Sequence, residues 1–251
     1  MARPSLVLVH GNFGTAAGWS PFQAAMEARG YDVHAVDLPW EKSPRTGGVP
    51  DLRDYVDALV DFVRSKQLKS VALVGHSFGG VPVSLATEAL QEETKVLAYL
   101  DAHLLQDNEN FTAFLPESFM EGVRQEAAET GGWWFRKCIP ADKWAAGYYN
   151  DIPYEEAKKA WDASHAEPIN VWLDRVNLPA SFTNTSRPSI FVEFLNDQCH
   201  GPEHWKLMTQ RLPNCITRKT PGGHFAFATH PEEVAAALDD ALQEALGTSE
   251  S

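Results

Sequence analysis

Residues 74–80 carry the strongest sign of chemistry in the chain. They read Val-Gly-His-Ser-Phe-Gly-Gly and contain the pattern Gly-x-Ser-x-Gly, centred on Ser77. A strand that turns sharply into a helix at this pattern pushes the serine hydroxyl outward, and Gly75 and Gly79 remove side chains that would collide across the turn. The segment lacks the lysine of a phosphate-binding loop and the spacing of a dinucleotide-binding loop. We therefore predict that Ser77 is a nucleophile that attacks a carbonyl carbon.

A base and an acid for this nucleophile follow later in the chain. His224 stands in the glycine-rich segment Thr220–Phe225, and the pKa of an imidazole suits a general base near neutral pH. Asp197 follows the strand predicted at Ser189–Leu195, from which a loop can bring it to His224, and we predict that it is the acid. Asp101, at the end of the preceding predicted strand, is the alternative. The order serine, aspartate, histidine matches one known class of catalytic triad.

A tetrahedral intermediate also needs two N–H donors for its oxyanion. The segment His10–Gly14 follows the first predicted strand and contains two glycines, so its backbone can direct an N–H into the site. We predict that the backbone N–H groups of Asn12 and Phe78 are the two donors. Phe13 is predicted to contact the substrate, and so is His76, which we expect to lie beside the turn at Ser77.

The other histidines give weaker signals. His200 and His204 are four residues apart, a spacing that binds zinc on a helix, but Gly201 and Pro202 lie between them. No third ligand is obvious in the sequence, so we predict no metal site and no cofactor. Four further histidines are predicted to be packing or surface residues: His34, His103, His165 and His230.

Alternating strands and helices are needed to bring these segments together. Short apolar runs predict six strands, at Ser5–Val9, Tyr31–Leu38, Ser70–Val74, Val96–Leu100, Ser189–Leu195 and Cys215–Lys219. Helical spacing of apolar residues predicts five helices, at Ser20–Arg29, Asp51–Lys66, Ser77–Glu93, Pro202–Leu212 and Pro231–Leu246. This alternation predicts an α/β fold with about six mostly parallel strands flanked by helices.

The alternation stops between residues 104 and 182. This stretch holds five of the eight tryptophans and is predicted to form several short helices, for example Glu155–Ser164. We predict that residues 104–182 are a helical cap inserted into a core made of residues 1–103 and 183–251. A cap at this point lies over the carboxyl ends of the strands, where open α/β sheets bind ligands. We expect Trp133 and Trp134 of the cap to contact a hydrophobic substrate.

Composition excludes several classes of protein. The 251 residues carry 21 basic and 34 acidic side chains, a net charge of −13 that opposes binding to nucleic acid or to anionic membranes. No apolar run reaches the ~18–20 residues that span a bilayer. Three cysteines without a Cys-x-x-Cys spacing argue against a disulfide framework. The N-terminal apolar run is too short for a signal peptide, so we expect a cytoplasmic protein, with a homodimer as a possible assembly.

These segments, in this order, resemble the α/β-hydrolase superfamily over nearly the whole chain. The short N-terminus is similar to the branch of plant methylesterases, hydroxynitrile lyases and their bacterial esterase relatives. Leu8–Gly11 followed by Gly18 and Trp19 matches the first loop of that branch, and Asp197–Pro202 followed by Trp205 looks like its acid loop.

The resemblance implies a six-stranded parallel sheet with a helical cap, and Ser77, Asp197 and His224 as nucleophile, acid and base. Hydroxynitrile lyases of this type carry a lysine after the catalytic histidine and a threonine after the loop histidine, where this chain has Phe225 and Gly11. We therefore expect a serine hydrolase that cleaves a neutral hydrophobic ester or lactone. Lyase-type carbonyl chemistry, or a small-molecule receptor with a residual hydrolase triad, is the alternative.

Overall fold

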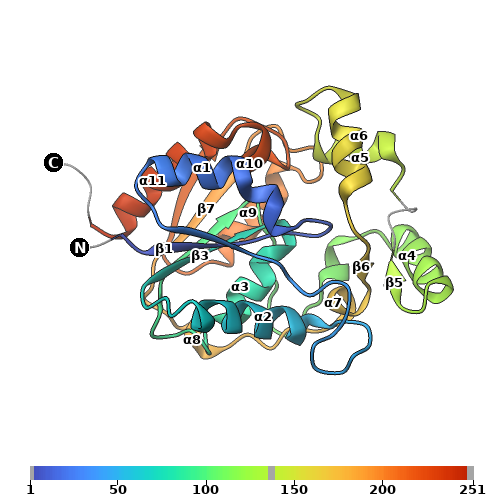
Figure 1. Ribbon diagram of the computed structural model, residues 1–251, viewed down its shortest axis with the longest axis horizontal. Helices are drawn as coiled ribbons and strands as arrows, with labels where there is room; N and C mark the ends of the chain where they lie inside the picture. The colour runs from blue at the N-terminus through green and yellow to red at the C-terminus, as the bar shows by residue number, and fades with distance from the viewer. Residues whose placement is uncertain (1–2, 135–138, 248–251) are drawn as a thin grey trace.

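Six parallel strands form the central sheet of the computed structural model, which describes residues 3–134 and 139–247 (Figure 1). Neighbouring strands are hydrogen-bonded in the order β2-β1-β3-β4-β7-β8, and each pair is parallel. Their bounds are Ser5–Val9 (β1), Val33–Val36 (β2), Val71–His76 (β3), Thr94–Leu100 (β4), Ser189–Phe194 (β7) and Cys215–Thr220 (β8). The predicted fold class is confirmed.

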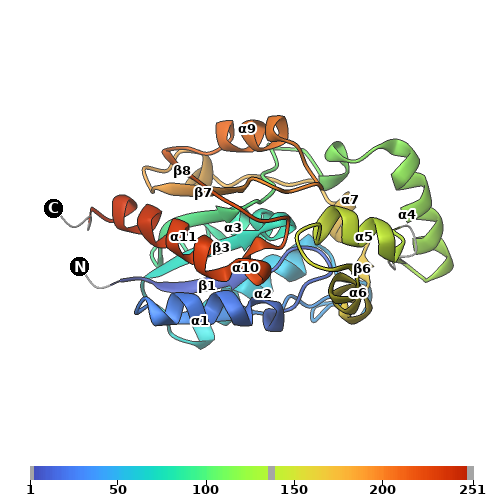
Figure 2. The ribbon, with the colours of Figure 1, turned by 90° about the horizontal axis from the view of Figure 1, so that it is seen from above.

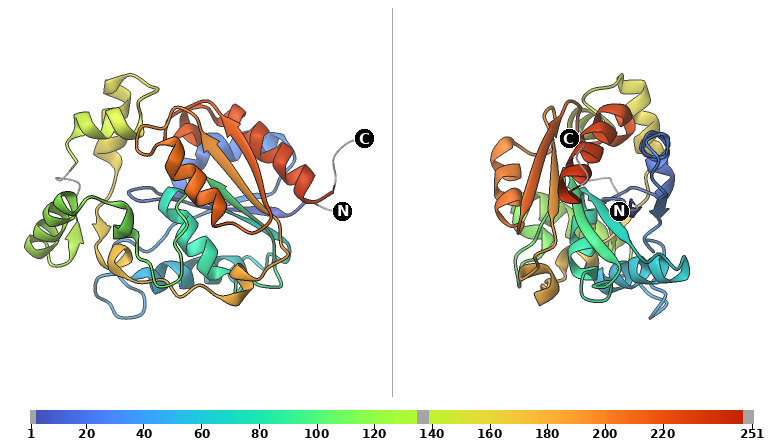
Figure 3. Two further views of the ribbon diagram at one scale, coloured as in Figure 1. Left: turned by 180° about the vertical axis from the view of Figure 1, so that it is seen from behind. Right: turned by 90° about the vertical axis from the view of Figure 1, so that its left-hand side faces the viewer.

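Helices cover both faces of this sheet. α1 (Ser20–Ala28) packs against α11 (Pro231–Ala245) on one face, and α2 (Leu52–Ser65) packs against α3 (Gly80–Ala86) on the other (Figure 1). α9 (Pro202–Gln210) lies over β7 and β8 on the side away from α11 (Figures 2 and 3). The central strands are therefore buried on both sides, which is why their sequences are continuous apolar runs and do not alternate.

Local sequence determines where the helices begin and end. Asp51 and Asp54 form a reciprocal capping box at the start of α2, each side chain accepting the backbone N–H of the other at 3.1 Å. The helix predicted at Ser77–Glu93 is shorter than expected. It consists of the 3₁₀ turn η2 (Ser77–Gly79) and α3, and residues 87–93 form turns. Thr87 explains this early end, because its hydroxyl donates to the Ser84 carbonyl at 2.8 Å and competes with the helix.

The chain between β4 and β7 forms a group of short elements beyond the carboxyl ends of the strands, far from both termini (Figure 1). They are η3 (Phe111–Phe114), α4 (Glu117–Glu129), β5 (Trp133–Trp134), α5 (Ala141–Tyr148), α6 (Tyr154–Ala163), β6 (Glu167–Pro168), α7 (Asn170–Leu173) and α8 (Ala180–Thr183). The short antiparallel pair β5–β6 was not predicted. α8 lies apart from the rest beside α3, where the hydroxyl oxygens of Ser181 and Thr87 are 3.2 Å apart.

Loops at the carboxyl ends of five strands carry the candidate site. In the register of the sheet, Val9 pairs with Gly75 and His76 pairs with Leu100, so neighbouring strands end at nearly the same level. The residues that follow these ends are His10, Ser77, Asp101, Asp197 and His224. Two short segments complete the described helices, η1 (Ala16–Trp19) and α10 (Ala226–Thr229). None of the helices in the described ranges is both long and apolar enough to cross a bilayer.

Candidate active site

Ser77 occupies a strained turn between β3 and α3. Its φ is +51°, in the left-handed region that residues other than glycine rarely adopt. The glycines around it are required by close backbone approaches. A Cβ on Gly75 would lie 2.7 Å from the carbonyl oxygen of Gly79, and a Cβ on Gly79 would lie 2.5 Å from that of Val9. The pattern Gly-x-Ser-x-Gly therefore reflects close packing of the backbone at this turn.

His224 lies within hydrogen-bond distance of Ser77. Its Nε2 atom is 3.0 Å from the Ser77 Oγ, and both side chains are almost completely buried. The loop that carries His224 follows β8 and is fixed by Asp151, which accepts the backbone N–H of Gly223 at 2.8 Å. This geometry allows the imidazole to take the hydroxyl proton of the serine.

Two carboxylates lie close to Nδ1, the other ring nitrogen of His224. The Nδ1 atom lies 3.3 Å from Oδ2 of Asp101 and 3.5 Å from Oδ2 of Asp197. Asp101 is completely buried, with a φ of +48°, and its Oδ1 accepts the backbone N–H of Phe194. Asp197 accepts the backbone N–H groups of Cys199 and His200 at 2.8 and 3.2 Å. Both acids considered in the sequence are thus present at the imidazole.

The surroundings give the two carboxylates different protonation preferences. Burial raises the pKa of Asp101 well above its ordinary value; a hydrogen bond from His224 opposes this rise, and the charge of Asp197 adds to it. Burial alone would raise the pKa of Asp197, but the charge of His224 and the Cys199 N–H lower it to about 2. Burial alone would lower the pKa of His224, but the two nearby carboxylates outweigh this effect and raise the pKa to about 9. Asp197 therefore holds the negative charge more readily than Asp101.

The loop after β1 lies directly against the Ser77 side chain. A Cβ on Gly11 would be 2.7 Å from the Cβ of Ser77, so only glycine fits this contact. Next in the loop, Asn12 lines the same cavity as Ser77, and its side-chain oxygen accepts the indole N–H of Trp172 at 3.1 Å. The predicted donor Asn12 is therefore close to the serine and held in place by a side chain of the inserted segment.

A buried glutamate holds the next residue of this loop. Glu167 in β6 accepts the backbone N–H of Phe13, which has a φ of +64°, and also contacts the hydroxyl of Tyr55 at 3.2 Å. Burial raises the pKa of Glu167, an effect that these hydrogen bonds oppose. Sequence reasoning did not identify Glu167, because no local pattern connects it to a loop 154 residues away.

Ser77 and His224 open into an apolar cavity of about 300 Å³. Its lining includes Phe111 and Trp172 from the inserted segment, and Tyr148, whose ring lies edge-on to His224 with centroids 5.4 Å apart. Among the described residues that line it there is no lysine, arginine, aspartate or glutamate. The cavity is at the small end of the usual range for ligand sites, which is about 300–1,000 Å³.

Two of the predicted substrate contacts line a different cavity. Phe13 and His76 face a second space of about 320 Å³ and are absent from the described lining of the first. His76 turns away because its Nε2 bonds to the His224 carbonyl oxygen at 2.8 Å and its ring packs against Phe227. Phe13 turns away because its ring packs edge-on against Trp144, with centroids 5.3 Å apart.

The two predicted tryptophan contacts lie in β5. Trp133 pairs with Pro168 and is not among the described residues that line either cavity. Its strand pairs with β6, and Trp172 and Tyr148 are aromatic residues of the inserted segment that do line the first cavity. The side chain of Trp134 lies outside the described residues.

Comparison with known proteins places the chain in a family. The model of the "Alpha/beta hydrolase family" matches residues 6–237. Methylesterase 1 of Arabidopsis thaliana is 34% identical over 250 residues, which cover 92% of this chain and 93% of that protein. The chain belongs to the alpha/beta hydrolase family. Polyneuridine aldehyde esterase of Rauvolfia serpentina is 33% identical over 109 residues, 42% of this chain and 41% of that protein.

Solved structures of alpha/beta hydrolases share the fold at lower identity. An extracellular alpha/beta-hydrolase from a Paenibacillus species has a TM-score of 0.83 at 18% identity, covering 95% of this chain and 98% of that one. A pyrethroid hydrolase from Sphingobium faniae has a TM-score of 0.75 at 20% identity, covering 97% and 99%. The resemblance to the plant methylesterase branch is confirmed, and these relatives support an enzyme of the esterase class.

Proposed function

We propose that the protein is a serine hydrolase that cleaves a neutral, hydrophobic carboxylic ester or lactone through an acyl-enzyme. The observation that carries the proposal is the 3.0 Å approach of His224 Nε2 to Ser77 Oγ, at the wall of an apolar cavity. A serine with a base at hydrogen-bond distance, and carboxylates behind that base, is the arrangement that makes a hydroxyl nucleophilic.

In this proposal, Ser77 attacks the ester carbonyl while His224 takes its proton. The backbone N–H groups of Asn12 and Phe78 stabilise the oxyanion, and Asp197 stabilises the imidazolium that forms. His224 then gives the proton to the leaving alcohol, which departs and leaves an acyl-enzyme. Water, activated by the same imidazole, releases the acid and restores Ser77.

The lining of the cavity supports a small and uncharged substrate. A carboxylate buried there would have no lysine or arginine partner among the described lining residues, and an unpaired buried charge is costly. Several relatives are named methylesterases, which supports a small alcohol such as methanol as the leaving group. We therefore propose short alkyl esters of compact hydrophobic acids, and the corresponding lactones, as substrates.

A panel of p-nitrophenyl and methyl esters tests this function. We expect turnover above ~1 s⁻¹ on the best ester, an ordinary value for an enzyme, and loss of nearly all of it in Ser77→Ala. Tight binding of these esters without turnover would instead indicate a receptor. Release of an aldehyde from a cyanohydrin, without ester cleavage, would indicate a lyase. Either of the last two results would overturn the proposed hydrolysis.

A further inference from the structure

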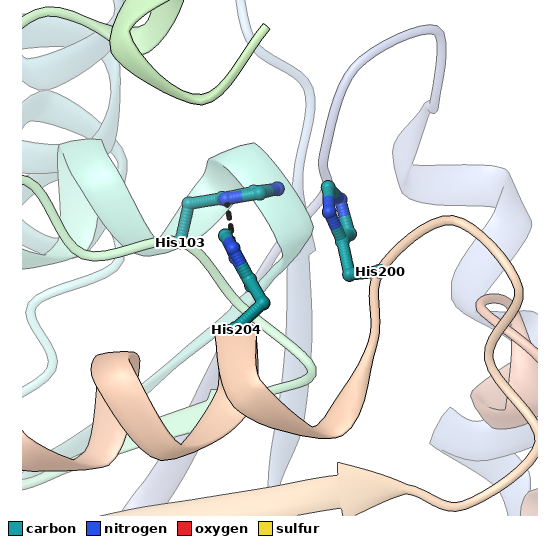
Figure 4. Close-up of side chains that lie close together, drawn as sticks. All are labelled: His103, His200 and His204. Carbon is teal, nitrogen blue, oxygen red and sulfur yellow. Dashed lines mark hydrogen bonds between the residues drawn. The ribbon is translucent and has the colours of Figure 1, made fainter.

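Three histidines gather beside the proposed triad without being part of it. His103 follows β4 and is 1% exposed, His200 lies in the loop after β7, and His204 is in the first turn of α9. Figure 4 shows the three rings converging from these two separate segments of chain. One ligand nitrogen from each ring lies within 4.8 Å of the other two. The sequence showed no third ligand beside His200 and His204, and in the fold His103 takes that position.

The spacing of these nitrogens matches that of metal ligands. His204 Nε2 lies 3.2 Å from His103 Nδ1, and these two nitrogens share a hydrogen bond that an ion between them would replace. Two imidazoles bound tetrahedrally to zinc, with Zn–N bonds of 2.0–2.1 Å, have nitrogens about 3.3 Å apart. The ring nitrogens of His200 have no hydrogen-bond partner among the described residues, and the ring stacks on that of His204 with centroids 4.4 Å apart. Binding of a shared ion therefore requires the His200 ring to turn out of this stack.

His103 is almost completely buried, and His200 and His204 are half-buried beside it. A metal ion binds the lone pair of a neutral imidazole. No carboxylate forms an ion pair with any of the three rings in the described chain. The guanidinium of Arg211, at the end of α9, forms an ion pair with Glu109 at 2.7 Å.

We propose that His103, His200 and His204 bind one divalent transition-metal ion of the Zn²⁺ class. Three imidazoles suit zinc, cobalt, nickel or copper and not the oxygen-seeking magnesium or calcium. His103 and His200 also line the cavity that contains Ser77, and the rings of His200 and His224 have centroids 5.8 Å apart. The inference does not rest on the proposed ester hydrolysis.

The test uses the untagged full chain, freed of metal with a chelator and dialysed. Calorimetric titration with ZnCl₂ should show one ion per chain, saturating at micromolar concentrations. Titration with CoCl₂ should give the strong visible absorption of four-coordinate cobalt with nitrogen ligands, without a thiolate band. His103→Gln and His204→Gln should each weaken the affinity by at least about tenfold, because each removes a ligand. Thermal melting of the metal-free variants checks that they are folded.

Two controls separate this site from others. His34→Gln, at a histidine of β2 outside the cluster, should leave both titrations unchanged, and so should Ser77→Ala. A second group of ligating side chains lies nearby, formed by Asp197, Cys199 and His224. Cys199→Ser should therefore also leave binding unchanged. Absence of saturable binding, equal binding by His103→Gln and the wild type, or loss of binding in Cys199→Ser with a cobalt–thiolate band would overturn the proposal.

Discussion

Asp101 lies 3.3 Å from Nδ1 of His224, slightly closer than Asp197 to the same nitrogen. The imidazole has one Nδ1–H and faces two carboxylates, which come from the ends of β4 and β7. Distance alone would favour Asp101 as the acid that stabilises the imidazolium. Its complete burial, however, penalises its charged form, whereas two backbone N–H groups stabilise the charge on Asp197.

The first prediction separates the two acids. Asp197→Asn should lower kcat by about 10³–10⁴, because it removes the charge that stabilises the imidazolium. Asp101→Asn should have a far smaller effect, at most about tenfold, because asparagine keeps the shape of a neutral carboxyl group. The measurement is kcat on the best ester of the panel, with thermal melting to check that both variants are folded. The reverse order of the two effects would transfer the role of the acid to Asp101.

The second prediction concerns the turn that holds Ser77. Gly79→Val should abolish most activity, because its side chain would collide with the carbonyl oxygens of Val9 and His10, at 2.5 and 2.6 Å from the Cβ position. Phe78→Ala should keep most of the activity, since its proposed role is played by the backbone N–H. Steady-state kinetics on one ester compares the two. Near-wild-type rates in Gly79→Val would contradict the proposed turn geometry.

The third prediction is a loss of stability in mild acid. The Nε2 of His10 accepts the backbone N–H of Leu38 at 3.1 Å and its Nδ1 bonds to the Gly11 carbonyl at 2.9 Å, an arrangement available only to the neutral ring. Burial lowers the pKa of His10 to about 4, below the 6.5 of the unfolded chain. Between these values the unfolded chain binds a proton that the folded protein does not. Stability should therefore fall as the pH falls from about 6.5 to about 4, by about 3 kcal/mol from this residue at most.

Urea unfolding at a series of pH values measures this effect. Other buried histidines add to the slope in the wild type, so the comparison is between the wild type and His10→Gln. The variant should lose less stability over the same pH interval, whatever its stability at pH 7. Identical slopes in the two proteins would show that His10 is not a source of the acid sensitivity.

The parts of this site that sequence could predict are those that depend on local backbone geometry. The glycines around Ser77 are dictated by contacts within one turn, and their spacing is visible in a single segment. His224 follows a strand on a glycine-rich loop, which is also a local feature. The four central strands were found for the same reason, because burial on both faces makes them apolar runs, whereas the edge strands β2 and β8 are only partly buried.

The parts that sequence missed are contacts between distant segments. His103 meets His204 across 101 residues, and Glu167 reaches Phe13 across 154 residues. Neither pair has a periodic or spacing signal, because the contact depends on how the inserted segment and α9 sit over the sheet. The sequence also could not show which of the two cavities His76 lines. A neighbour of Ser77 along the chain points to the opposite side of the turn, into the second cavity.

The last prediction concerns substrate size. Phe119 lines the cavity from α4 without a role in the proposed chemistry, so Phe119→Ala should enlarge the space for the acyl group. In the wild type, kcat/KM should rise by about fourfold for each added methylene until the cavity of about 300 Å³ is filled, and then fall. The variant should reach its maximum at a longer chain. A carboxylated analogue should be a poor substrate of both, because the described lining has no lysine or arginine to pair with it.

Leu207→Ala is the matched control, because this exposed side chain of α9 is not among the described residues that line the cavity. Its chain-length profile should coincide with that of the wild type. The measurement is kcat/KM for p-nitrophenyl esters of increasing acyl length, with an aromatic ester and the carboxylated analogue. A flat profile from acetyl upward, or a preference for the carboxylated ester, would mean that burial of apolar surface does not select the substrate. An unchanged maximum in Phe119→Ala would place the acyl group in the second cavity, beside Phe13 and Trp144.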